Sequence, residues 1–113
     1  MASAITVCQQ RGVLNDVACA RLWADHWARA GWAWPAIHEK LSAKGLAEAA
    51  IAAARHDIGA GPQEELMRAR AVRDNLRQRR PVASDSAVAR RLASRGFDED
   101  VIERLFNERN AER

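Results

Sequence analysis

The stretch AIHEKLSAKGLAEAAIAAAR, residues 36–55, decides the fold. It holds an apolar pair one helical turn apart, a glycine turn, and an apolar residue in a second helix: Ile37, Leu41, Lys44-Gly45-Leu46 and Ile51. The same pattern returns at a constant offset of 51 residues: Val88, Leu92, Arg95-Gly96-Phe97 and Ile102. An offset that stays constant through two helices and their turn indicates copies of one supersecondary unit.

The composition favours helix throughout. The chain has 113 residues, no Tyr, 3 Pro and 6 Gly, and much of its apolar content is alanine. No alternating run of β-branched residues suggests a strand. We therefore predict an all-α protein, built of tandem three-helix (helix-turn-helix-like) repeats in a curved stack.

Glycine and proline mark the expected helix boundaries, because glycine ends helices and proline begins them. We expect an N-cap at Asn15 or Asp16, another at Ser84 or Asp85, and one at Asp98. The predicted organisation is a remnant helix of an incomplete first repeat in 1–13, a three-helix repeat in 14–58 and a second in 62–110.

Basic residues are concentrated in the middle of the chain, although the net charge is only +3. Arg73, Arg77 and Arg80 share one helix face, and only Asp74 and Asp85 offset the arginines of this span. Such a face predicts an anion-binding surface for a nucleic-acid backbone or an acidic protein groove. The candidate partner-binding residues are Arg73, Arg77, Arg80, Arg90, Arg91, Arg95, Lys40 and Lys44.

No motif for catalysis, a cofactor or a metal is present in the sequence. His26, His38 and His56 lack metal-ligand spacing, and Cys8 and Cys19 are interpreted as small buried hydrophobes with reduced thiols. No signal peptide or membrane span is predicted. We expect a cytoplasmic, monomeric protein that is not an enzyme and holds no cofactor.

Four tryptophans lie close together in the first half of the chain. Trp23 and Trp27 share a helical stripe with Ala20, which predicts that they fill the core between the repeats. Trp32 and Trp34 lie in a turn, where packing and a role as interface anchor both remain open.

Sequence-specific reading of DNA by a helix-turn-helix is not favoured. The helix after the first turn, 47–55, is mostly alanine, and the helix after the second opens with Asp98, Glu99 and Asp100. Neither offers Arg, Asn or Gln where base contacts are made, and the acids would repel phosphate.

Three blocks of sequence lie in a common register. The first is Arg11-Gly12-Val13-Leu14-Asn15-Asp16 followed by Cys19-Ala20. The second is Arg29-Ala30-Gly31-Trp32, then Ile37, Leu41 and Lys44-Gly45-Leu46. The third is Arg90-Arg91-Leu92, Arg95-Gly96-Phe97 and Val101-Ile102. Together they resemble the RecX family of RecA regulators from about Ile5 to Asn110, with Cys19, Ala33 and Trp27 as departures.

The resemblance implies a curved stack of three-helix repeats that binds in the helical groove of the RecA–single-stranded DNA filament. It implies modulation, in the inhibitory direction, of RecA ATPase, recombinase and SOS-related activity. The positions that carry the family motif as structural residues are Asp16, Ala20, Gly31, Ile37, Leu41, Gly45, Gly96 and Phe97. The alternatives are a non-sequence-specific nucleic-acid-binding helical module and a truncated chain without function.

Overall fold

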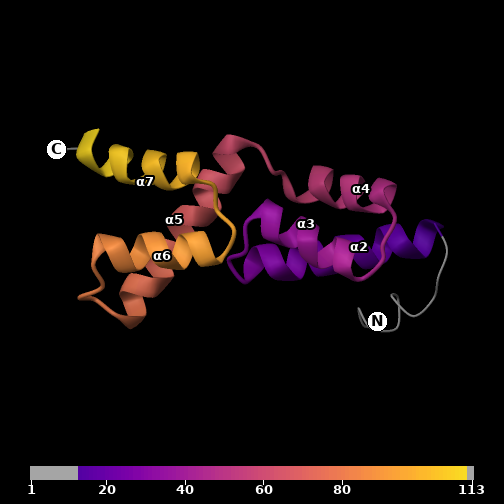
Figure 1. Ribbon diagram of the computed structural model, residues 1–113, viewed down its shortest axis with the longest axis horizontal. Coiled ribbons are helices and arrows are strands. Elements are labelled where there is room, and N and C mark those ends of the chain that lie inside the picture. Colours follow the sequence, from indigo (N-terminus) through magenta and orange to yellow (C-terminus); the bar gives the residue numbers. More distant parts are fainter. Residues whose placement is uncertain (1–12, 112–113) are drawn as a thin grey trace.

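The computed structural model describes residues 13–111 of the chain, with side chains from 15 to 108. This part is all-α and contains six helices and no strand, which confirms the predicted class. In chain order the helices are α2 (Val13–Arg29), α3 (Trp34–Ala43), α4 (Glu48–Ile58), α5 (Pro62–Arg79), α6 (Asp85–Ser94) and α7 (Glu99–Ala111) (Figure 1). The predicted remnant helix falls almost wholly outside the described residues.

Most helix boundaries follow from local sequence signals. Prolines stand in the first turns of α3 and α5, and the side chain of Ser84 caps α6 by accepting a hydrogen bond from the Ala87 N–H at 3.2 Å. The start of α2 is different. The helix begins at Val13, so the prediction of an N-cap at Asn15 or Asp16 is wrong.

The helices bury two separate hydrophobic clusters, one in each half of the molecule. The first cluster is drawn from α2, α3, α4 and the turn between α3 and α4, and α2 packs mainly along α4. The second is drawn from α5, α6, α7 and the turn before α7, and α5 packs along α7. Of the described residues before α5, only Ala33, in the loop between α2 and α3, belongs to the second cluster.

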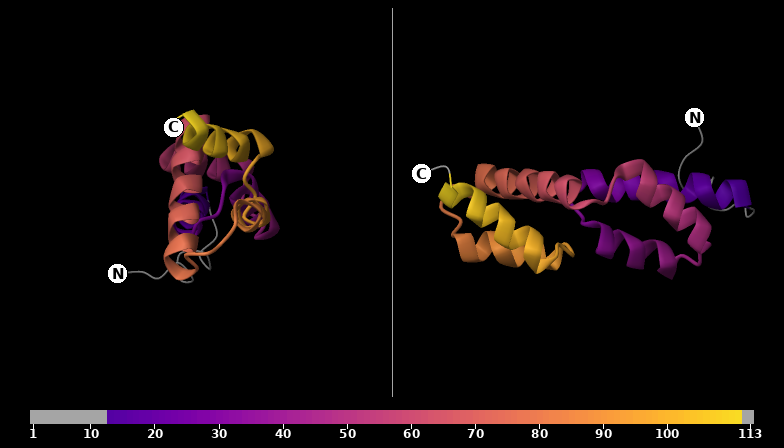
Figure 2. Two further views of the ribbon diagram at one scale, coloured as in Figure 1. Left: turned by 90° about the vertical axis from the view of Figure 1, so that its left-hand side faces the viewer. Right: turned by 90° about the horizontal axis from the view of Figure 1, so that it is seen from above.

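The halves lie end to end along the long axis, so the molecule measures 51 × 25 × 22 Å (Figure 2).

The residues of the repeated motif, 51 positions apart, have similar environments in most cases. Ile37 and Val88 are both fully buried, and so are Leu41 and Leu92. The corresponding turn glycines, Gly45 and Gly96, have φ angles of +78° and +89°, a region that glycine adopts without a steric penalty. One pair departs from the pattern, because Ile51 is buried whereas Ile102 is only partly buried.

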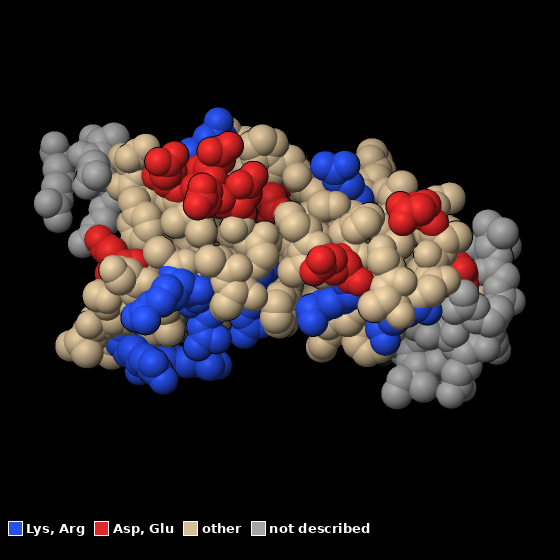
Figure 3. Space-filling view, in the orientation of Figure 1, with Lys and Arg blue, Asp and Glu red and all other residues tan. Residues whose placement is uncertain are grey.

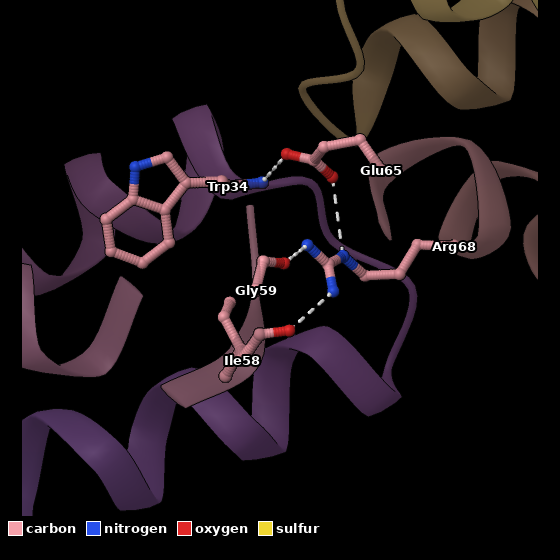
Figure 4. A network of polar contacts seen from close by, with 5 residues as sticks. All are labelled: Trp34, Ile58, Gly59, Glu65 and Arg68. Atoms are coloured by element: carbon pink, nitrogen blue, oxygen red, sulfur yellow. Dashed lines mark hydrogen bonds and ion pairs between the residues drawn. The ribbon is translucent and has the colours of Figure 1, made fainter. Parts of the chain in front are cut away.

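A buried carboxylate ties the two halves together. Glu65 in α5 is 7% exposed, and its Oε1 accepts a hydrogen bond of 2.7 Å from the Trp34 N–H at the start of α3 (Figure 4). Its Oε2 lies 3.3 Å from the Nε of Arg68. The Arg68 guanidinium also donates to the carbonyls of Ile58 and Gly59 at the end of α4. These contacts satisfy helix-end groups of both α3 and α4.

Cys19 is buried, as expected, but the thiol is not reduced. The residue is 1% exposed and is disulfide-bonded. The structure thus corrects the expectation of a reduced thiol at this position. The chain's other cysteine, Cys8, lies outside the described residues.

Among the described residues, no helix is both long enough and apolar enough to cross a bilayer.

Candidate functional site

A basic edge runs along one side of the second half of the molecule. It consists of Arg79 and Arg80 at the end of α5 and Arg90 and Arg91 on α6, all exposed. None of the four forms an ion pair with a described residue. Figure 3 shows Lys and Arg side chains gathered below α6, well apart from the acidic cluster over α7. The basic edge therefore presents uncompensated positive charge to solvent.

Two of the predicted arginines have their charge offset. Arg73 Nε lies 3.0 Å from Asp74, and Arg77 Nη2 lies 2.7 Å from Asp85 in α6. Both arginines are partly buried. The predicted stripe of Arg73, Arg77 and Arg80 therefore contains one arginine with a free charge, Arg80, and two that are neutralised locally.

A hollow of about 210 Å³ lies beside the basic edge, between the end of α2, the middle of α5 and the end of α6. We call it the arginine hollow. None of the described residues that line it is acidic, and Asn75 is among its polar lining residues. The arginines that line it are Arg29, Arg68, Arg79, Arg91 and Arg95. Arg29 and Arg68 pair with Asp25 and Glu65, so Arg79, Arg91 and Arg95 supply the charge that is free to meet an anion.

Three partly buried indoles, Trp23, Trp27 and Trp32, form a tryptophan row along α2 and the loop after it. The rings of Trp23 and Trp27 are stacked, with centroids 5.0 Å apart. Trp23 and Trp27 pack, partly buried, against the first cluster and are not part of the second, so the prediction that they fill the core between the repeats is wrong. Trp34 is buried, whereas Trp32 is only partly so.

Lysines from α3 and its C-terminal cap lie over the tryptophan row. The Nζ of Lys44 lies 4.4 Å from the Trp23 centroid, and the Nζ of Lys40 lies 4.2 Å from that of Trp32 and 5.5 Å from that of Trp27. Such cation–π contacts hold the long side chains over the rings. The structure thus places the predicted residues Lys40 and Lys44 apart from the basic edge, on the aromatic surface.

Arg95 joins the two surfaces. Its guanidinium carbon lies 4.4 Å from the centroid of Trp32, and its side chain also lines the arginine hollow. Its backbone carbonyl accepts a 2.9 Å hydrogen bond from the Ala33 N–H, which fixes the turn after α6 against the loop after α2. Aromatic faces and free guanidinium groups therefore meet at one point of the surface.

The opposite side is acidic. Asp98, Asp100 and Glu103 line a second hollow of about 510 Å³, which also contains Arg55 and Arg104. Figure 3 shows the acids of this region as a cluster over α7. The molecule is therefore polarised, with its positive edge at α6 and its negative face at α7.

No cluster in the described part of the chain is suited to bind a metal, since no three His, Cys, Asp or Glu side chains are grouped for it. His26 packs edge-on against Trp23, and His38 lies 3.7 Å from Glu48.

The motif residues from the sequence blocks are structural in position. Ala20, Ile37, Leu41 and Phe97 are buried, and Gly31, Gly45 and Gly96 have positive φ. Asp16 lies in the first turn of α2.

Sequence reasoning missed Glu65, Arg79 and the joining role of Arg95. One signal was available for the aromatic surface, because Lys40 and Lys44 have the same four-residue spacing as Trp23 and Trp27.

No protein-family model, curated protein or solved structure matches this chain.

Proposed function

We propose that the chain is a tandem repeat of a three-helix unit that acts as a non-catalytic regulator of RecA. It binds the RecA–single-stranded DNA filament and lowers the ATPase, recombinase and SOS-related activity of RecA. The name of the partner comes from the resemblance of the three sequence blocks to the RecX family. The general type of target, a long polyanionic surface, comes from the charge and shape of the molecule.

The repeat is supported by the two halves themselves. Each half has three helices around its own hydrophobic cluster, and the buried motif residues Ile37, Leu41 and Leu46 correspond to the buried Val88, Leu92 and Phe97. The turn glycines at the same offset both have positive φ. A duplicated unit of this kind builds an extended body, which suits a filament groove better than a compact pocket.

The observation that carries the proposal is the basic edge. Four exposed arginines without an acidic partner in the described structure lie on one side, and the acids of α7 lie on another. Uncompensated guanidinium groups bind phosphate and carboxylate groups strongly and steer the approach of a polyanion. A filament that contains DNA offers such groups along its length.

The direct test is the single-stranded-DNA-dependent ATPase of RecA, measured with increasing amounts of this protein. We expect the rate to fall, and we expect R80Q/R90Q to be weaker than the wild type. R104Q is the matched control, because Arg104 is exposed, forms no ion pair with a described residue and lies in the acidic hollow. An unchanged ATPase rate at a molar excess of the protein over RecA would exclude the proposal.

A second candidate function is non-sequence-specific binding of nucleic acid without RecA. The first turns of α4 and α7 favour it over base-specific reading, because they carry Glu48, Glu99 and Asp100 where a reading helix needs donors. Binding would then come from phosphate contacts and weaken steeply with added salt. Electrophoretic mobility shifts with unrelated DNA sequences, repeated across a salt series, test this candidate.

A further inference from the structure

We infer that the arginine hollow and the adjoining Trp32 form a binding site for single-stranded nucleic acid, in which phosphates bind Arg79, Arg91 and Arg95 and an unpaired base stacks on Trp32. The inference rests on the proposed function, because it takes from it that the target contains single-stranded DNA. It adds that this surface contacts the phosphates and an unpaired base of that strand.

The first step is charge. The hollow contains three guanidinium groups that make no ion pair with any described residue, and its lining includes no acid. They come from two helices, α5 and the end of α6 with its turn, so the charge converges on a concave surface. A concave group of free guanidinium groups fits a phosphodiester backbone, because each can donate two hydrogen bonds to one phosphate.

The second step is the aromatic surface beside it. Trp32 is partly exposed, and two cations lie over its ring, with the Arg95 guanidinium carbon at 4.4 Å and the Lys40 Nζ at 4.2 Å from the centroid. A further hollow, between the start of α3 and the end of α6, opens beside the indole, and its lining includes Trp32, Pro35, Lys40 and one acid, Glu39. A base entering there displaces a flexible cation from the indole face.

The third step decides between two kinds of anionic ligand, a nucleic acid and an acidic protein segment. The carboxylates of an acidic protein segment would bind the arginines and make no use of the indole. An aromatic ring next to free guanidinium groups instead matches the alternation of base and phosphate in a single strand. Duplex DNA offers the same phosphates but keeps its bases paired and stacked, so an indole face gains nothing from it. The surface therefore predicts a preference for single strands with little dependence on sequence.

The experiment uses the full chain without RecA and a labelled oligothymidylate, with a duplex of equal length for comparison. Fluorescence anisotropy reports affinity, and quenching of intrinsic tryptophan emission reports stacking. The variants are W32L, which keeps apolar bulk, W32F, which keeps a smaller ring, and R91Q/R95Q, with R104Q as the charge control. Circular dichroism checks that each variant is folded.

We expect the single strand to bind more tightly than the duplex and to quench tryptophan emission. W32L should weaken single-strand binding by about tenfold, the effect of removing the platform for one stacked base, and W32F by less. R91Q/R95Q should reduce the salt dependence of single-strand binding, by about 0.7 in log–log slope for each phosphate that the variant no longer neutralises.

Equal affinity for single strand and duplex, or an unchanged affinity in folded W32L, would overturn the inference. If W32L does not fold, quenching in the wild type and the slope of R91Q/R95Q decide the question. Inhibition of RecA without binding to oligothymidylate leaves the proposed function standing and removes this site. Oligothymidylate binding that depends on Trp32, with no effect on RecA, keeps this site and removes the proposed function.

Discussion

Gly96 and Ala36 touch where the two halves of the molecule meet. A Cβ atom on Gly96 would lie 2.7 Å from the Cβ of Ala36 and 3.1 Å from its backbone nitrogen. The turn after α6 therefore packs directly on the first turn of α3. Beside this contact, the Ala33 N–H donates its hydrogen bond to the carbonyl of Arg95. The relative position of the halves thus depends on a glycine at position 96 for two reasons, its φ angle and its lack of a side chain.

A comparison of Gly45 with Gly96 distinguishes the effect of the φ angle from the effect of the missing side chain. Gly45 has a similar positive φ, but a Cβ atom there would meet nothing within 4 Å. We expect G45A to lower the free energy of unfolding by about 1 kcal/mol, the cost of a left-handed backbone. G96A should lower it by about 1–3 kcal/mol more, because the added methyl group collides with Ala36. Urea denaturation measures both, and equal decreases would show that the packing at Gly96 is not tight.

The buried carboxylate gives a second prediction. Replacing Glu65 by Ala leaves the Trp34 N–H without its acceptor and removes one partner of Arg68. We expect E65A to lower the free energy of unfolding by about 3 kcal/mol, within the range for breaking a buried polar pair. E65Q, which keeps an acceptor oxygen, should have a smaller effect.

E103A is the control for this change, since Glu103 is an exposed residue within α7. We expect it to stay within about 0.5 kcal/mol of the wild type in the same denaturation experiment. A similarly small decrease for E65A would mean that the Glu65 hydrogen bonds do not hold the halves together.

The corresponding leucines of the two clusters should matter equally. Leu41 and Leu92 are both fully buried, and truncation of such a leucine costs about 2–5 kcal/mol. L41A and L92A should therefore both lower the thermal midpoint strongly. L22A should have a small effect, because Leu22 is 42% exposed. A tolerated L92A would indicate that the second cluster contributes little to stability.

Paired and unpaired arginines should differ in their interaction with a polyanion. R73Q/R77Q and R80Q/R90Q remove the same net charge, but Arg73 and Arg77 are already neutralised by Asp74 and Asp85. We expect only R80Q/R90Q to reduce the salt dependence of single-stranded DNA binding, by about 0.7 in log–log slope for each phosphate released. Affinity measured at several salt concentrations tests this, and equal slopes for both variants would contradict it.

Local signals in the sequence predicted most of the helices. Proline at the start of α3 and α5, the cap at Ser84 and the turn glycines at 45 and 96 all act within a few residues of their own position. The start of α2 departs from the prediction, because Asn15 has the side chain of a good cap but lies inside the helix, which extends past it to Val13. A capping residue indicates where a helix can begin. The residues next to the cap decide whether the helix begins there.

The candidate site was harder to predict because its residues meet only in the folded chain. The pairing of Arg77 with Asp85 crosses from α5 to α6, and Arg95 reaches Trp32 from the other half of the molecule. Helical periodicity places Arg73, Arg77 and Arg80 on one face but does not show which of their charges are already offset. The buried position of Glu65 likewise depends on the packing of α5 against the start of α3.

The separation of the two hydrophobic clusters has a consequence for how the molecule opens. Among the described residues, only Ala33 packs into the hydrophobic cluster of the other half, and the remaining links between the halves include the polar contacts of Glu65, Arg68 and Arg95. Once these contacts break, α2, α3 and α4 can open as one unit while α5, α6 and α7 keep their amide protons shielded from solvent exchange, and the reverse holds as well. Arg95 and Trp32 lie on opposite sides of that boundary, so whatever molecule bridges them also suppresses this partial opening.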